Sequence, residues 1–129
     1  MIECNAYFQR EDESRYLKEQ NILMQAWSPL AGGKEDLFTN EILCSIAKKH
    51  DKSVAQIVLR WLVQRKIVPV VKSSNPVRMK ENLDIFDFDL SKEEMKQIAT
   101  LDTGHTYATA RSTGKAVTEF LEKANQYHV

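Results

Sequence analysis

The chain has 129 residues, in which 18 Lys and Arg balance 18 Asp and Glu and 43% of residues are hydrophobic. This composition is typical of a globular domain, and the zero formal net charge argues against nucleic-acid binding, which requires a basic face. No apolar run approaches the roughly 20 residues of a membrane span, and no signal-peptide pattern opens the chain. The two cysteines have no metal-ligand spacing, so the sequence predicts a cytoplasmic protein without a metal site.

Strand and helix patterns alternate along the first quarter of the chain. Residues 1–8 alternate apolar and polar side chains and predict a short strand. Residues 11–20 predict a helix whose thin buried stripe consists of Tyr16 and Leu17. The apolar run at residues 22–27 ends at turn-forming residues and predicts a buried parallel strand.

The middle of the chain continues this alternation. Residues 30–39 contain a Gly-Gly pair and predict a loop, and residues 40–50 predict a helix that its initial asparagine caps. Residues 53–64 begin with a capping-box pattern and predict a helix with a wide apolar face. The run 67–71 predicts a strand, with Pro69 at its start or at an irregularity because proline cannot donate to the ladder. A second, polar face of the helix at 53–64 carries Gln56, Arg60 and Gln64.

The last part of the sequence predicts three further helices. An Asn-Pro pair precedes a helix at residues 77–83, and a second capping box begins a helix at residues 91–101. Residues 117–124 place apolar side chains at helical spacing and predict a terminal helix. Strands that alternate with helices in this order predict an α/β fold with a parallel sheet.

Residues 72–82 carry the clearest chemical signal. They leave a predicted parallel strand and enter a helix, a junction at which backbone N–H groups and the helix dipole favour anions. Lys72 and Arg78 add two positive charges and two serines add hydroxyl groups, which suits a phosphate. Two cations and two serines at a helix start are also common on solvated surfaces, so spacing alone leaves that alternative open.

Three motifs together resemble one known family. Residues 72–82 read Lys-Ser, four residues, Arg, two residues, Glu-Asn. Residues 26–30 read Ala-Trp-Ser-Pro-Leu. Residues 2–7 read Ile-Glu-Cys-Asn-Ala-Tyr, where the family has His-Pro in place of Asn-Ala. These motifs, in this order, resemble the aldo-keto reductase family. The resemblance covers residues 1–104 as the C-terminal part of that family's barrel and leaves residues 105–129 as a divergent tail.

The resemblance implies a fold, an activity and a cofactor. The family forms a TIM (β/α)₈ barrel and uses NADP(H) to reduce aldehydes and ketones to alcohols. A complete barrel needs about 250 residues, so this chain is expected to supply the C-terminal three βα units of an incomplete barrel. Family roles carried to matching positions assign the 2′-phosphate to Lys72, Ser73 and Arg78, adenine to Glu81 and Asn82, nicotinamide stacking to Trp27, and the pyrophosphate loop to Ser28 and Leu30.

The resemblance assigns no catalytic residue to this chain. The family's Asp, Tyr, Lys and His set lies N-terminal to the matched region, so a carbonyl substrate is expected only if an N-terminal half completes the site. By itself the chain would have the cofactor-binding motifs but would not catalyse carbonyl reduction. Two alternatives remain: half of a reductase that is active with a complementing chain, and a non-enzymatic relic fragment. The open sheet edges of such a fragment would favour oligomerisation.

Overall fold

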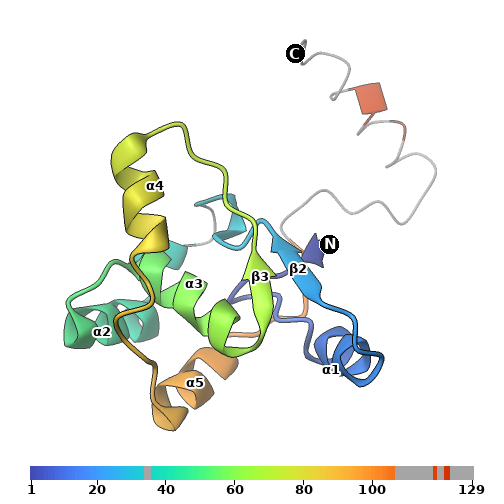
Figure 1. Ribbon diagram of the computed structural model, residues 1–129, viewed down its shortest axis with the longest axis horizontal. Helices are drawn as coiled ribbons and strands as arrows, with labels where there is room; N and C mark the ends of the chain where they lie inside the picture. The colour runs from blue at the N-terminus through green and yellow to red at the C-terminus, as the bar shows by residue number, and fades with distance from the viewer. Residues whose placement is uncertain (34–35, 107–117, 119–120, 123–129) are drawn as a thin grey trace.

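The computed structural model describes residues 1–33, 36–106, 118, 121 and 122. In this part of the chain strands alternate with α-helices, and the strands form a three-stranded parallel sheet, as the sequence predicts (Figure 1). None of the described helices combines the length and the apolar character that a membrane crossing requires. Most of the predicted terminal helix, 117–124, lies outside the described residues. The elements are β1 (Ile2–Glu3), α1 (Glu11–Glu19), β2 (Met24–Trp27), α2 (Glu41–His50), α3 (Val54–Gln64), β3 (Ile67–Pro69), α4 (Pro76–Leu83) and α5 (Lys92–Ala99), with 3₁₀ turns at Ala31–Gly33 and Leu37–Thr39.

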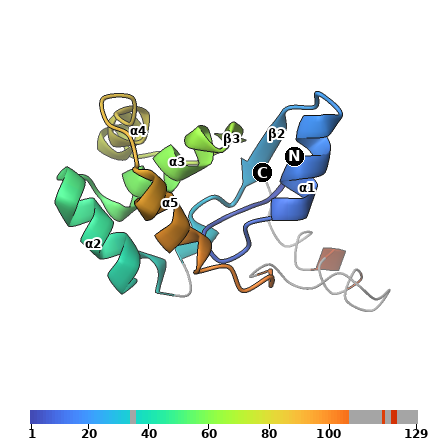
Figure 2. The same ribbon diagram turned by 90° about the horizontal axis from the view of Figure 1, so that it is seen from below.

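The sheet follows chain order, β1-β2-β3, and every pairing is parallel. Ala26 is opposite Ile2 on one side and Pro69 on the other, which makes β2 the central strand. Figures 1 and 2 both show α3 between α2 and β3, with α1 beside β2. Among the described strands, β1 and β3 each keep one free edge, an arrangement that is consistent with an incomplete barrel.

A side-chain cap begins each α-helix after α1. Ser53 and Ser91 form the predicted capping boxes, in which the serine hydroxyl accepts from the third helical N–H and the side chain there accepts from the serine N–H. Asn40 accepts from Leu43 N–H at 3.1 Å, which begins α2 as predicted. Asn75 caps α4 in the same way. The structure confirms these helix starts. They could be predicted from the sequence because a cap involves residues only three positions apart.

The hydrophobic core centres on the apolar face of α3. Trp61 is 1% exposed, and Ile57, Val58, Leu59 and Leu62 are completely buried. One core joins Trp61, Ile57, Val58 and Leu62 to residues from β1, β2, β3, α2 and α5, so α3 is covered on several sides. This confirms the wide apolar stripe that the sequence indicates. Because this face is buried, α3 is anchored in the core.

Three predictions about the strands and the first helix are wrong in detail. Ile22 and Leu23 are 54% and 66% exposed because they precede the paired part of β2, where Ile22 N–H instead donates to Leu17 O. Tyr16 is 61% exposed, so only Leu17 of the predicted pair packs against the core. Pro69 ends β3 rather than starting it. Its missing N–H costs no bond to β2, because the N–H of the next residue, Val70, donates to Ala26 O at 2.9 Å.

Candidate functional site

The candidate site lies where β2 and β3 end. The carboxyl ends of the strands form this edge of the sheet, which is different from the unpaired sides of β1 and β3. The chain leaves β3 at Pro69, crosses residues 70–75 and enters α4 (Figure 1). Residues 28–33 leave β2 at the same edge. Ligands of α/β proteins bind at this edge because loops from neighbouring strands meet there. Both segments that the family resemblance singles out therefore lie at one end of the sheet.

The structure brings most of the predicted cofactor residues into one pocket of about 360 Å³, called the α4 pocket here. Leu30 forms part of one wall, and residues of α4 and the loop before it form the other. A neighbouring hollow of about 440 Å³ shares Leu30, Lys72 and Arg78 with the α4 pocket and adds Ser28. Trp27, half-buried at the end of β2, lines neither. The predicted residues that line the α4 pocket are Leu30, Lys72, Ser73, Arg78, Glu81 and Asn82.

Two cations of the α4 pocket have no carboxylate partner in the described part of the chain. Lys72 and Arg78 are exposed and make no salt bridge there, whereas Lys52, Arg60 and Arg65 each pair with an Asp or Glu. Lys72 and Arg78 also line a further hollow around Ser73–Asn75 together. Two uncompensated cations on one concave surface attract a dianion such as a phosphate, because no internal salt bridge has to break.

The start of α4 differs from the anion site that the sequence predicts. Asn75 Oδ1 accepts from Val77 N–H at 2.9 Å and from Arg78 N–H at 3.4 Å, so these two donors are already occupied. Ser73 Oγ accepts from Asn75 N–H at 3.2 Å, which holds the serine within the turn. An anion in this structure would therefore meet the side chains of Lys72 and Arg78 rather than those two backbone donors.

Left-handed backbone shapes the opposite wall. Ser28 and Ala31 have φ of 52°, a conformation that costs a side-chain-bearing residue roughly 1–3 kcal/mol. Hydrogen bonds from Ala31 N–H to Ser28 O and from Gly33 N–H to Leu30 O close this turn at 3.0 and 2.9 Å. The same conformation occurs elsewhere, at Arg10, Asn21, Asp36, Asp51 and Lys66, so it shapes this wall without by itself marking a site.

The sequence reasoning missed other residues of the α4 pocket. Phe38 follows the Gly-Gly pair in the chain and lines both hollows, and Val54 and Ala55 line the α4 pocket from the start of α3. An aromatic residue inside a predicted loop was the available signal for Phe38, which is 46% exposed. The positions of Val54 and Ala55 depend on how α3 packs against α4, which no local pattern records.

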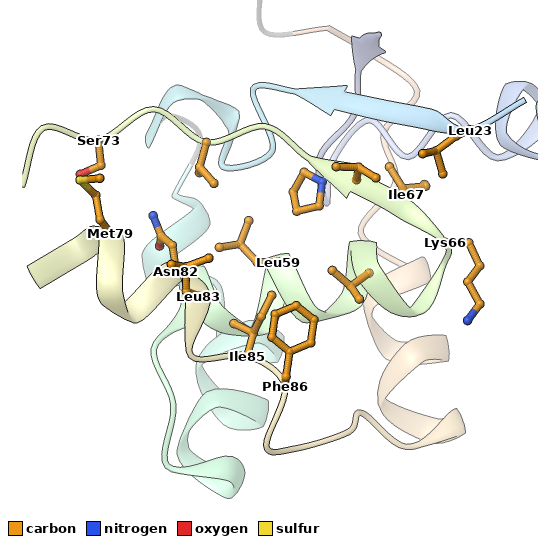
Figure 3. A pocket seen from close by; sticks show the side chains of 14 residues that line it. Leu23, Leu59, Lys66, Ile67, Ser73, Met79, Asn82, Leu83, Ile85 and Phe86 are labelled. Atoms are coloured by element: carbon orange, nitrogen blue, oxygen red, sulfur yellow. The ribbon is translucent and has the colours of Figure 1, made fainter. Parts of the chain in front are cut away.

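A larger, mostly apolar pocket of about 610 Å³ adjoins the α4 pocket and shares Val71, Ser73 and Asn82 with it. Figure 3 shows Leu59, Ile85 and Phe86 gathered beside β3. This apolar pocket lies at the free edge of the sheet, and Leu23, Val68, Met79, Leu83 and Phe86 of its lining are exposed. An apolar surface of this extent is typical of a region that another part of a protein covers.

The titratable groups outside the pocket have structural surroundings. Burial raises the pKa of the Cys4 thiol, although Arg65 nearby opposes this shift. Burial also disfavours the charged form of Glu94, but hydrogen bonds from Ser91 N–H and His50 outweigh it and lower the pKa of Glu94. His50 Nε2 lies 2.9 Å from both Glu94 oxygens and joins α2 to α5. Among the described residues no cluster of His, Cys, Asp and Glu could hold a metal ion.

Comparison with known proteins settles the family. The model of the Aldo/keto reductase family matches residues 1–103. The chain belongs to the aldo-keto reductase family. Aldose reductase B of Dictyostelium discoideum is 45% identical over 102 residues, which are 79% of this chain and 33% of that protein. The chain thus spans about a third of the length of the curated relatives it matches.

Solved structures agree with this family assignment. The aldo-keto reductase MGS-M4, from a Medee basin deep-sea metagenome library, matches with a TM-score of 0.82 and 39% identity over 88% of this chain and 43% of that chain. A crystal structure of a Gox0644 mutant in complex with NADPH matches with a TM-score of 0.74 and 30% identity over 92% of this chain and 42% of that chain. NADP(H) use therefore occurs among the structural relatives of this chain.

Proposed function

We propose that these residues supply the adenosine-phosphate half of the NADP(H) site of an aldo-keto reductase. The observation that carries this proposal is that Lys72 and Arg78, which make no salt bridge among the described residues, line a pocket together with Glu81 and Asn82. The guanidinium of Arg78 can grip a phosphate in a fork, and the Lys72 ammonium adds a point charge. Recognition of the 2′-phosphate by these cations would select NADP over NAD.

The remaining predicted residues extend this site along the sheet edge. Glu81 and Asn82 would hydrogen-bond adenine from the last turn of α4, and Ser28 and Leu30 would contact the pyrophosphate from the strained turn after β2. Trp27 would stack against nicotinamide at the end of β2. NADPH, when bound, supplies a hydride to a carbonyl carbon. The residues of this chain would bind and orient the cofactor.

We infer that carbonyl reduction needs groups from outside these 129 residues. The Asp, Tyr, Lys and His set that the family resemblance describes has no matching positions here, and Tyr7 is buried in the core. The assignment of β1, β2 and β3 to the last three βα units of the barrel rests on the order of the three motifs. We also propose a cytoplasmic location, which the two free thiols support.

A specific observation favours the alternative in which another chain, or another part of the whole protein, completes the reductase. The free edge of β3 lies next to the 610 Å³ apolar pocket, which offers both strand pairing and apolar burial to such a partner. Co-expression of this chain with the part of Aldose reductase B outside the matched segment tests this. NADPH-dependent aldehyde reduction should appear only in the combination; soluble but separate and inactive products count against it.

Calorimetric titration with NADPH and with NADH tests the main proposal. Arg78→Ala should weaken NADPH binding about tenfold or more, the value expected for a lost charge-assisted hydrogen bond, and should leave NADH binding unchanged. Lys80→Ala is the matched control, because Lys80 is another exposed cation of α4 that does not line the α4 pocket. Equal losses in the two variants, or no preference for NADPH in the unaltered chain, would contradict the assignment.

A further inference from the structure

Helix α4, which carries residues proposed to bind the phosphate and the adenine, is only weakly anchored to the protein core. None of the side chains of α4 is buried, and Val77, Met79 and Leu83 are 66%, 51% and 73% exposed. Hydrophobic burial therefore does little to fix where Arg78 lies relative to the opposite wall of the α4 pocket. Polar contacts have to supply that restraint.

We propose that Gln56 is the positioning residue of α4 and thereby of the proposed NADP(H) site. Gln56 lies in the first turn of α3 and is only 6% exposed. Its Nε2 donates to Glu81 O at 3.0 Å and to Asp84 O at 3.2 Å, across 25 and 28 residues of sequence. Its Oε1 accepts from Ser53 N–H at 3.0 Å, so both ends of the amide are in use. The role in cofactor binding rests on the proposed function, whereas the role in holding α4 does not.

The bond from Gln56 reaches the turn of α4 that matters for the site. Glu81 O belongs to the last turn of the helix, where it also accepts from Asp84 N–H at 3.0 Å, and Glu81 and Asn82 line the α4 pocket. At the other end of the link, Ser53, Val54 and Ala55 line the pocket from the start of α3. Gln56 thus joins two walls of the same pocket, and α3 in turn is anchored in the core.

No other side chain outside residues 72–84 donates to the backbone of α4 within the part of the chain that the structure describes. Lys52 comes nearest, with Nζ 3.3 Å from Asp84 O, an acceptor that it shares with Gln56, and 3.2 Å from an Asp87 carboxylate oxygen. Both acceptors follow the helix, so the bond from Gln56 to Glu81 O is the one that reaches α4 itself. Gln64, two turns along the same face of α3, exchanges hydrogen bonds with Leu90 N–H and O at 2.7 and 3.0 Å, away from α4. Gln64 therefore offers a matched control for Gln56.

Gln56→Glu isolates the donor function. A glutamate can still accept from Ser53 N–H, as Glu94 does in the capping box of α5, but it presents an acceptor to the two carbonyl groups instead of a donor. Gln56→Met is the second variant, because it removes the donor without adding charge and keeps the length of the side chain. It also removes the acceptor for Ser53 N–H, which Gln56→Glu retains, so the two variants together separate the donor from the cap. Gln64→Glu makes the same chemical change where no pocket wall is involved.

The test measures amide hydrogen exchange in α4 and the binding of adenosine 2′,5′-bisphosphate against adenosine 5′-phosphate. Gln56→Glu and Gln56→Met should speed exchange of the α4 amides about tenfold or more, the effect of two ordinary hydrogen bonds, and reduce the preference for the bisphosphate. Gln64→Glu should leave both readouts unchanged, even where it lowers the free energy of unfolding.

Two results would overturn the proposal. One is α4 exchange at the unaltered rate in either Gln56 variant; the other is a uniform increase across α3, α4 and α5, which would indicate general destabilisation. The exchange measurement needs no ligand. If the unaltered chain binds no bisphosphate, the proposed function fails on its own, and exchange still decides whether Gln56 positions α4.

Discussion

The cap of α4 provides a quantitative test of how weakly this helix is held. Asn75→Ala removes the acceptor for Val77 N–H and Arg78 N–H, at 2.9 and 3.4 Å. Replacing an Asn cap by Ala costs about 1 kcal/mol, which corresponds to a roughly fivefold change in an equilibrium constant. Because α4 buries none of its side chains, the helix can open while the core stays folded, so its amides should exchange through local opening and report this cost directly.

The assay combines native-state hydrogen exchange with urea unfolding. Asn75→Ala should speed exchange of the α4 amides about fivefold, and this exchange should depend little on urea, because local opening exposes little surface. Ser91→Ala is the control, because Ser91 caps α5, a helix that buries Ile98 in the core. There the same loss of about 1 kcal/mol should lower the global stability.

The expectation is refuted if exchange of the α4 amides in Asn75→Ala depends on urea as strongly as exchange of the core amides does. That result would mean that α4 opens only with the core, and that contacts other than its cap and Gln56 bind the helix to the domain.

Three further predictions concern the core and the titratable groups. Because the pKa of Glu94 is lowered in the folded chain, the stability it contributes should be complete above the ordinary carboxyl value of 4.5 and lost as pH falls through the lowered one; urea unfolding across this range should show a flatter pH dependence for Glu94→Gln. Cys44 should react with iodoacetamide before Cys4, whose thiol is fully buried and has a raised pKa, as mass spectrometry can show. Trp61→Ala should lower the free energy of unfolding by about 3–5 kcal/mol.

Each of these three has a clear contrary result. An acid sensitivity of Glu94→Gln equal to that of the unaltered chain would show that the hydrogen bonds to Glu94 from Ser91 N–H and His50 add no pH-dependent stability. Labelling of Cys4 at the rate of Cys44 would show that the first strand opens readily. A loss below about 1 kcal/mol for Trp61→Ala would place the core elsewhere.

The helix starts could be predicted from the sequence, whereas the strand ends could not. A cap such as Ser53 with Gln56 acts over three residues, so its signal is complete within the local sequence. Strand limits depend on partners far along the chain: Ile22 resembles a strand residue but lies before the part of β2 that pairs, and Val71 is apolar but follows the end of β3. Tertiary pairing overrides the local pattern in both places.

The candidate site follows the same division. Lys72 and Arg78 belong to one continuous motif, and their place together in the α4 pocket follows from a short loop and a helix. Phe38 and Ala55 enter the pocket from other segments, and the bond from Gln56 to the last turn of α4 spans 25 residues. Contacts between separate segments depend on packing, and no spacing rule in one sequence reports them.

The central claim is that residues 72–82 recognise the 2′-phosphate of NADP(H). An NMR titration of the isotopically labelled chain with NADP⁺ and, separately, with NAD⁺ tests it most directly. With NADP⁺, amide shift changes should concentrate in residues 28–33 and 72–82, and the changes at Lys72 and Arg78 should be weak or absent with NAD⁺. Equal changes with both cofactors, or changes confined to the apolar pocket beside β3, would contradict the account.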